Sequence, residues 1–181
     1  MCLNRAHKLR IKEQLKLYRN EENMNLKDLY EGEEINGASA IYMDENCTVP
    51  YTGHVEDYFQ GKISWECDIV NGLKEGIEKN YYDFTGELES VNEMKDNSGN
   101  GLSVEYYKNG KIKSISTVIN DLNIDSYLYD EDGNLVQVSL MKENGSIGIN
   151  YAYIKDKLPD LREKYDLEKM NREILESGKL K

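Results

Sequence analysis

The sequence predicts a mainly β protein in which tandem β-hairpins form an elongated antiparallel meander sheet, with a helix at each end of the chain. One phrase recurs four times with small variations: one or two aromatic residues, a short turn, a glycine and an apolar residue. Its glycines are Gly61, Gly86, Gly110 and Gly133, which are 25, 24 and 23 residues apart. Self-similarity at such a period indicates a repeat array, in which each unit buries its apolar face against its neighbours.

A tyrosine precedes each turn, and in most copies a glycine lies five residues before that tyrosine. The same offset extends the array at both ends, so the sequence predicts six strands with tyrosine in register. These tyrosines are Tyr42, Tyr58, Tyr81, Tyr106, Tyr129 and Tyr153.

The strand that leaves each turn does not alternate cleanly, since its apolar residues are three apart, as at Ile112, Ile115 and Val118. A β-bulge or strong twist would reconcile that spacing with a pleated strand, and a helix is the other interpretation. Four glycine-bounded copies with β-branched residues favour the strand. Asn109-Gly110 and Asp132-Gly133 are the clearest candidates for primed hairpin turns, which need positive φ angles. Second turns are expected at Asn71-Gly72, Asn97-Ser98-Gly99, Asn120-Asp121 and Asn144-Gly145.

We divide the chain into a basic N-terminal helix or arm (1–24), the β-hairpin array (25–154) and a C-terminal helix that caps the array (155–181). The first twenty residues carry a charge of +5. A basic helix suits a nucleic acid or a membrane, but a terminal helix lying on the acidic body, or a frayed tail, is the favoured interpretation. In the C-terminal helix, Asp156 is the expected cap, Pro159 suits the first turn and Gly178 suits the stop. Its apolar stripe from Leu158 to Ile174 is expected to cover the last strand.

Residues 21–181 hold 17 Lys+Arg against 33 Asp+Glu, a net charge of −16. Such a body repels nucleic acid and anionic lipid, and attracts basic partners. The alternative is that the acidity only keeps a sheet with a small core in solution. The sequence shows neither an apolar run long enough to span a membrane nor the pattern of a signal peptide, so we expect a cytoplasmic protein.

Signs of catalytic chemistry are nearly absent. The two histidines stand in unrelated contexts, no nucleophile, phosphate-loop or dinucleotide motif is present, and the three cysteines are scattered. Asp130 to Gly133 mimics the opening of a calcium loop, but Ser139 stands where that loop needs a glutamate. The sequence therefore predicts a protein that is not an enzyme, with no catalytic residue, no cofactor and no metal.

Two stretches resemble a known family. The unit EYYKNGKIKS (105–114), with the neighbouring NGLKEG (71–76), resembles the MORN-repeat variant found in bacteria. The entry VPYTGHVEDYFQGKISWE (49–66) resembles the opening of the YwqK-family antitoxins. The likeness covers about residues 25–154, and VINDLNID (118–125) departs from it because the Asn-Gly pair and the repeat-opening glycine are lost. It implies a MORN-like array of tandem β-hairpin repeats.

The resemblance also implies an antitoxin or immunity protein that neutralises a toxin by binding it. An acidic body agrees with a basic, nucleic-acid-acting partner. Aromatic residues are the usual anchors of interfaces, although packing within the array is the favoured alternative for each one here. The partner-binding candidates are Phe59, Trp65, Tyr82, Tyr107, Glu56, Asp57, Asp83 and Glu105.

Two other functions stay open. The first is a phage-type inhibitor of a bacterial defence nuclease that uses the same acidic surface as a nucleic-acid mimic. The second is a structural, membrane-associated scaffold. An open sheet edge could also pair with a second copy and give a homodimer.

Overall fold

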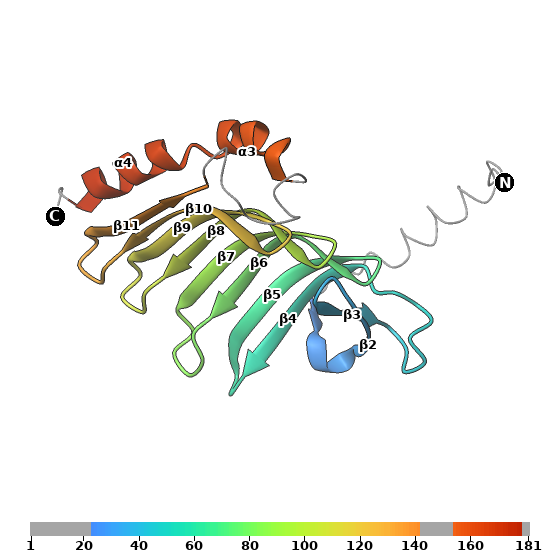
Figure 1. Ribbon diagram of the computed structural model, residues 1–181. Helices are drawn as coiled ribbons and strands as arrows, with labels where there is room; N and C mark the ends of the chain where they lie inside the picture. Colours follow the sequence, from blue (N-terminus) through green and yellow to red (C-terminus); the bar gives the residue numbers. More distant parts are fainter. Residues whose placement is uncertain (1–22, 142–153, 179–181) are drawn as a thin grey trace.

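A computed structural model describes residues 23–141 and 154–178, which form one long sheet, a small hairpin and two C-terminal helices (Figure 1). The first elements are β1 Met24–Asn25, the 3-10 helix η1 Leu26–Asp28, β2 Tyr30–Ile35 and β3 Ala38–Tyr42. The regular array comprises β4 Gly53–Phe59, β5 Lys62–Val70, β6 Leu73–Tyr81, β7 Leu88–Lys95, β8 Ser98–Tyr106, β9 Ile112–Ile119, β10 Leu122–Tyr129 and β11 Leu135–Leu140. The helices are α3 Leu158–Lys164 and α4 Leu167–Gly178.

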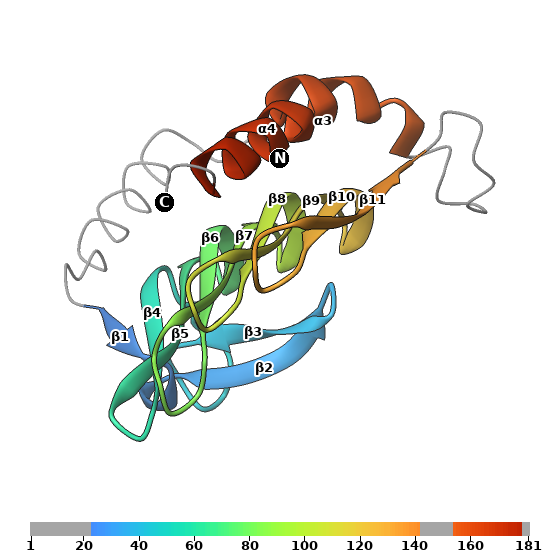
Figure 2. The same cartoon turned by 90° about the vertical axis from the view of Figure 1, so that its left-hand side faces the viewer.

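The long sheet confirms the expected meander. Strands β4 to β11 pair antiparallel, each with the next along the chain, and the short strand β1 adds to β4 in parallel. Strands β2 and β3 pair only with each other. Figure 2 shows α3 and α4 above one face of the sheet and the β2–β3 hairpin beneath the other.

A β-bulge recurs just before the tyrosine at the end of every second strand. The register shifts immediately before Tyr58, Tyr81, Tyr106 and Tyr129; the last three end β6, β8 and β10, and Tyr58 is the last residue but one of β4. At Tyr106 the extra residue is Lys113 of β9, which explains why Ile112 and Ile115 are three apart. Residues 112–119 form a strand, so the helix interpretation of residues 112–118 is wrong. Of the six tyrosines that we expected in register, these four occupy equivalent positions in the long sheet. Tyr42 belongs to the separate β2–β3 sheet, and Tyr153 lies outside the described residues.

The turns between successive strands lie alternately at the two ends of the sheet. At one end, which we call the turn end, Asn71-Gly72, Asp96-Asn97 and Asn120-Asp121 have two consecutive positive φ angles, as a primed two-residue turn requires. At the other end, the tip end, Gln60-Gly61 also has two positive φ angles, but at Gly110 and Gly133 only the glycine does. Our choice of these two sites as the clearest primed turns was therefore wrong. The expected turn at residues 97–99 is shifted to Asp96-Asn97, because Ser98 already begins β8.

The C-terminal helix is broken in two. Pro159 lies in the first turn of α3, as expected, but Lys157 rather than Asp156 occupies the cap position and makes no side-chain capping bond. Helix α3 ends at Lys164 and α4 begins at Leu167, so the single helix that we expected is wrong.

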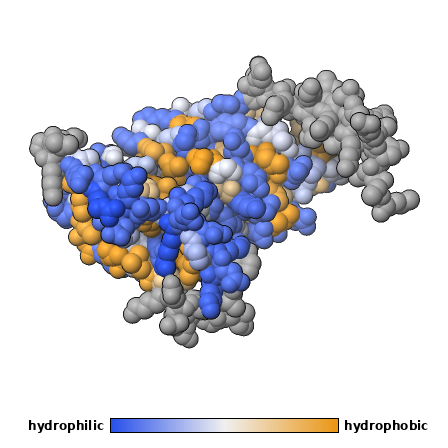
Figure 3. Space-filling model, turned by 90° about the horizontal axis from the view of Figure 1, so that it is seen from above, coloured by the Kyte–Doolittle hydropathy of each residue, from blue (hydrophilic) through white to orange (hydrophobic). Residues whose placement is uncertain are grey.

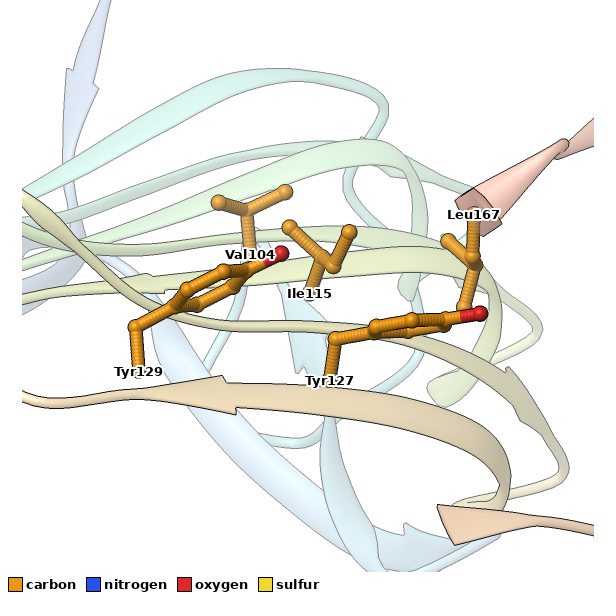
Figure 4. Packing of buried hydrophobic residues seen from close by; sticks show 5 residues of the cluster. All are labelled: Val104, Ile115, Tyr127, Tyr129 and Leu167. Atoms are coloured by element: carbon orange, nitrogen blue, oxygen red, sulfur yellow. The ribbon is translucent and has the colours of Figure 1, made fainter. Parts of the chain in front are cut away.

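The helices bury their apolar stripe on β8, β9 and β10, toward the β11 end of the sheet. Seen from above in Figure 3, the surface is mostly hydrophilic with patches of hydrophobic residues. Leu167, with Met170 and Ile174 of α4, packs on a cluster from β8, β9 and β10 (Figure 4). The buried members of that cluster are Val104, Ile115, Tyr127 and Tyr129. Leu158 and Leu161 of α3 join a second cluster with Ile119, Ile124 and Met141.

The strand that we expected the stripe to cover, which ends at Tyr153, lies outside the described residues, as does the basic N-terminal arm. Within the described residues, β11 is exposed along its whole length. The other face of the sheet is covered near β4 and β5, where Ile41 and Tyr51 pack on Val55 and Ile69.

Candidate protein-binding surface

The most exposed aromatic contact lies at the tip end of the sheet. Phe59 closes β4 and Phe84 lies in the β6–β7 loop, and their rings meet edge to face with centroids 5.0 Å apart. Phe59 is 38% exposed and Phe84 is 62% exposed. We call these two residues the aromatic tip pair. The loops at this end lie along the lower left of the sheet in Figure 1.

The backbone holds Phe84 in a conformation that a bulky side chain rarely adopts. Its φ is +69°, in the left-handed region, where an L-residue loses roughly 1–2 kcal/mol relative to its usual conformation. The loop is closed on both sides, since Gly86 donates its N–H to the carbonyl of Tyr82 and Tyr82 donates to that of Glu87. Lys62 Nζ donates to the Thr85 carbonyl at 3.1 Å, which ties the loop to the neighbouring hairpin. Strain of this kind is concentrated at functional sites.

Acidic residues are close to both members of the aromatic tip pair in the sequence. Asp83 is exposed directly before Phe84, and Asp57 lies two residues before Phe59 on the same strand. A hydrogen bond from the Thr85 side chain lowers the pKa of Glu87, so this carboxylate stays charged. An apolar contact with a negative rim suits a partner that offers an apolar residue among lysines and arginines.

The remaining sequence-predicted residues have partners within the array. The Tyr82 hydroxyl donates to the Tyr106 carbonyl at 2.7 Å, and the Tyr107 hydroxyl donates to the Tyr129 carbonyl at 2.8 Å. In both cases the second tyrosine of one repeat joins its unit to the backbone of the next. These two side chains are half-buried and serve the packing of the array.

Trp65 and Glu105 also have partners within the sheet. Trp65 is half-buried against the cluster under the β2–β3 hairpin. Glu105 is 3.1 Å from Lys113 in an ion pair between neighbouring strands. Glu56 accepts a hydrogen bond from Tyr58 at 2.6 Å, on the face opposite to its neighbour Asp57.

The sequence interpretation missed Phe84. Phe59 and Phe84 are the only phenylalanines of the chain. The signal was available, because YYDFTGEL places a large apolar residue where polar turn residues are the norm.

A second group of functional side chains lies on β4 and β5. The ring of His54 is 2.7 Å from Asp68 through Nδ1 and 3.3 Å from Glu66 through Nε2. Burial by itself would lower the pKa of His54, but the hydrogen bonds and negative charges of Asp68 and Glu66 outweigh it and raise that pKa. Within the described residues, His54, Glu56 and Glu66 form the one group of side chains placed to share a metal ion.

The turn end carries a hollow of about 580 Å³ that is lined by polar side chains, among them Asn36, Asp96, Asn120 and Asp121. Neither α3 nor α4 is long and apolar enough to cross a bilayer, and the same holds for every helix in the described part of the chain. A scan of protein-family models, a search of curated proteins and a search of solved structures each found no significant match.

Proposed function

We propose that this chain is a non-enzymatic protein-binding module that acts as an antitoxin, immunity protein or inhibitor by blocking a basic partner. The observation that carries the proposal is the aromatic tip pair, which is exposed at the tip end beside acidic residues. Its acidic rim includes Asp83 and Glu87.

The physical case rests on how interfaces gain free energy. A few well-placed aromatic residues dominate the binding energy of most interfaces, and rigid residues lose little entropy on binding. Phe59 and Phe84 support each other, and the Lys62–Thr85 bond fixes their two hairpins relative to each other. The array behind them therefore acts as a rigid support.

Charge supports the choice of partner. The chain carries a net charge of −11, which raises the association rate with a basic protein and disfavours contact with nucleic acid. The resemblance of residues 49–66 to the YwqK-family antitoxins agrees with a toxin that acts on nucleic acid as the target.

The test combines capture of the partner with rescue of its toxicity. Full-length chain is used to isolate its partner from the native cell, and the two genes are then expressed together in a sensitive host. We expect the chain to restore growth, and Phe59→Ala with Phe84→Gly to abolish both capture and rescue. Val136→Ser is the matched control, because it removes another exposed apolar side chain, 61% exposed, from a different strand. Full rescue by the double variant, or no partner retained at physiological salt, would overturn the proposal.

A further inference from the structure

We infer that β4 and β5 carry a binding site for a divalent transition-metal ion, with His54 Nε2, Glu56 Oε1 and Glu66 Oε2 as ligands. The inference is independent of the proposed function, since it uses neither Phe59 nor Phe84. One imidazole and two carboxylates form a donor set that suits Zn²⁺ and related ions.

The pairing of the two strands brings the ligands together. β4 and β5 are antiparallel neighbours, side by side in Figure 1, and His54 is opposite Asp68 while Glu56 is opposite Glu66. Residues directly opposite each other point to the same face, and so do residues two apart on one strand. All four side chains therefore stand on one face of the sheet.

The three ligand atoms already converge. His54 Nε2 is 3.3 Å from Glu66 Oε2 and 4.0 Å from Glu56 Oε1, and the ligand atoms all lie within 4.8 Å of one another. Zinc–ligand bonds of about 2.0–2.2 Å place tetrahedral ligand atoms roughly 3.3 Å apart. Small side-chain rotations are enough to close the site.

The other polar atom of each ligand is held by a different side chain. Asp68 holds Nδ1 of His54, which leaves the Nε2 lone pair for the metal when the proton is on Nδ1. Lys79 at 2.6 Å and Tyr81 at 2.7 Å both donate to Oε1 of Glu66. Outer contacts of this kind orient the ligands of metal sites, and a carboxylate next to a metal-bound histidine is their commonest form.

Glu56 is held in the same way. Tyr58 donates to its Oε2 at 2.6 Å, so that Oε1 is the atom directed at His54. Asn23 Nδ2 also lies 2.5 Å from Oε1, and a carboxylate oxygen has a second lone pair for a metal.

The balance of charge also favours a cation. Glu56 and Glu66 are directly opposite each other, and their side chains are only 16% and 13% exposed. Like charges in that position repel, and Lys79 pairs with Glu66. A divalent ion between the two carboxylates removes the repulsion. Three protein ligands leave at least one coordination position open.

The test is a calorimetric titration of the full chain, freed of metal by a chelator, with Zn²⁺. We expect one saturable site, and binding weakened more than about 100-fold by His54→Gln or Glu66→Gln. Asp68→Asn keeps all three ligands but removes the carboxylate charge beside Nδ1 of His54, so it should weaken binding by about 10–100-fold. His7→Gln and Glu89→Gln are the matched controls and should leave the affinity unchanged.

A second measurement tests the metal site even if a variant of one of the three ligands fails to fold. Co²⁺ should give a visible absorption spectrum with the wild-type chain, and Asp68→Asn, at a side chain that is 62% exposed, should change it. The absence of a one-to-one site, or equal affinities in the wild type, His54→Gln and Asp68→Asn chains, would overturn the inference.

Discussion

The indole N–H of Trp65 donates a 2.9 Å hydrogen bond to Oε1 of Glu78 on the neighbouring strand. Lys74 donates to the same oxygen at 2.6 Å, and its ammonium lies 5.0 Å from the centre of the Trp65 ring. Asn92 of β7 donates to the other carboxylate oxygen. Glu78 is thus a buried charge with three donors from three strands, and Trp65 is part of the frame of the sheet.

The stability of the sheet should depend on pH through Glu78. Burial by itself raises the pKa of Glu78, but the hydrogen bonds and charge of Lys74, with the Trp65 and Asn92 bonds, lower it below the ordinary value of 4.5. A carboxyl whose pKa is lower in the folded chain stabilises it above the unfolded pKa, and this contribution is lost as the pH falls through the folded pKa.

We therefore expect Glu78→Gln to lower the free energy of unfolding by about 1–3 kcal/mol at neutral pH. The difference from the wild type should shrink in acid, as measured by urea denaturation across the pH range. Glu89→Gln, at an exposed carboxylate of β7, is the control and should change stability little. A Glu78→Gln deficit that stays constant into strong acid would contradict this account.

An ion pair joins helix α3 to the sheet. Arg162 donates through Nε to Oδ2 of Asp125 at 2.7 Å, and through a second nitrogen to Oδ1 and to the Met141 carbonyl. The Asp125 side chain is only 5% exposed. Because removing one partner leaves a buried charge uncompensated, Arg162→Ala should destabilise the chain by about 3–5 kcal/mol.

Arg172→Ala is the control for that prediction. Arg172 pairs with Glu168 on the surface of α4, where both side chains are more than half exposed, and such pairs contribute about 0.3–0.5 kcal/mol. Chemical denaturation of the two variants measures both effects. Equal losses would show that the Asp125 contact does not fix the helix.

Phe84→Gly should make the chain more stable and at the same time weaken its binding to the partner. Glycine adopts positive φ without steric cost, so relief of the strained conformation should raise the free energy of unfolding by about 1 kcal/mol, as seen in the denaturation midpoint. The same change removes the ring that contacts Phe59, so partner affinity should fall. If the Phe84→Gly chain is less stable than the wild type, or binds the partner equally well, Phe84 is not an exposed binding residue held in a strained conformation.

The two cysteines in the described residues should react at very different rates. Burial, followed by the charge of Glu78, raises the pKa of the Cys67 thiol to about 12, and this side chain is fully buried. Cys47 is half-buried. With Cys2 replaced by serine, iodoacetamide should label Cys47 in the native chain and reach Cys67 only on unfolding, as peptide mass spectrometry can follow. Prompt labelling of Cys67 would contradict its burial.

The repeat period allowed most of the fold to be predicted from the sequence. Local turn chemistry and β-branched residues recur with it, so the meander from β4 to β11 could be predicted, and a β-bulge was one of the explanations offered for the strands that leave the turns. The break at Tyr165 and the separate hairpin ending at Tyr42 could not, because they depend on what those residues pack against. Helix α4, for example, packs on Tyr127 and Tyr129 of β10, and its position does not follow from its own apolar stripe alone.

The candidate surface was predictable only in part. Phe59 and its acidic neighbours were identified, but Tyr82 and Tyr107 look equally suitable in sequence and are tied to the backbone of the next repeat. Phe84 lies 25 residues from Phe59, and the two meet only because consecutive hairpins place their tips side by side. The grouping of His54 with Glu66 likewise depends on strand register.

Hydrogen–deuterium exchange of the chain with and without its partner tests the central claim most directly. The account predicts that binding slows exchange at the two adjacent tips, residues 58–62 and 82–88, while the turn end, at residues 71–72, 96–97 and 120–121, exchanges as in the free chain. Protection confined to the turn end, with the two tips unchanged, would contradict the account.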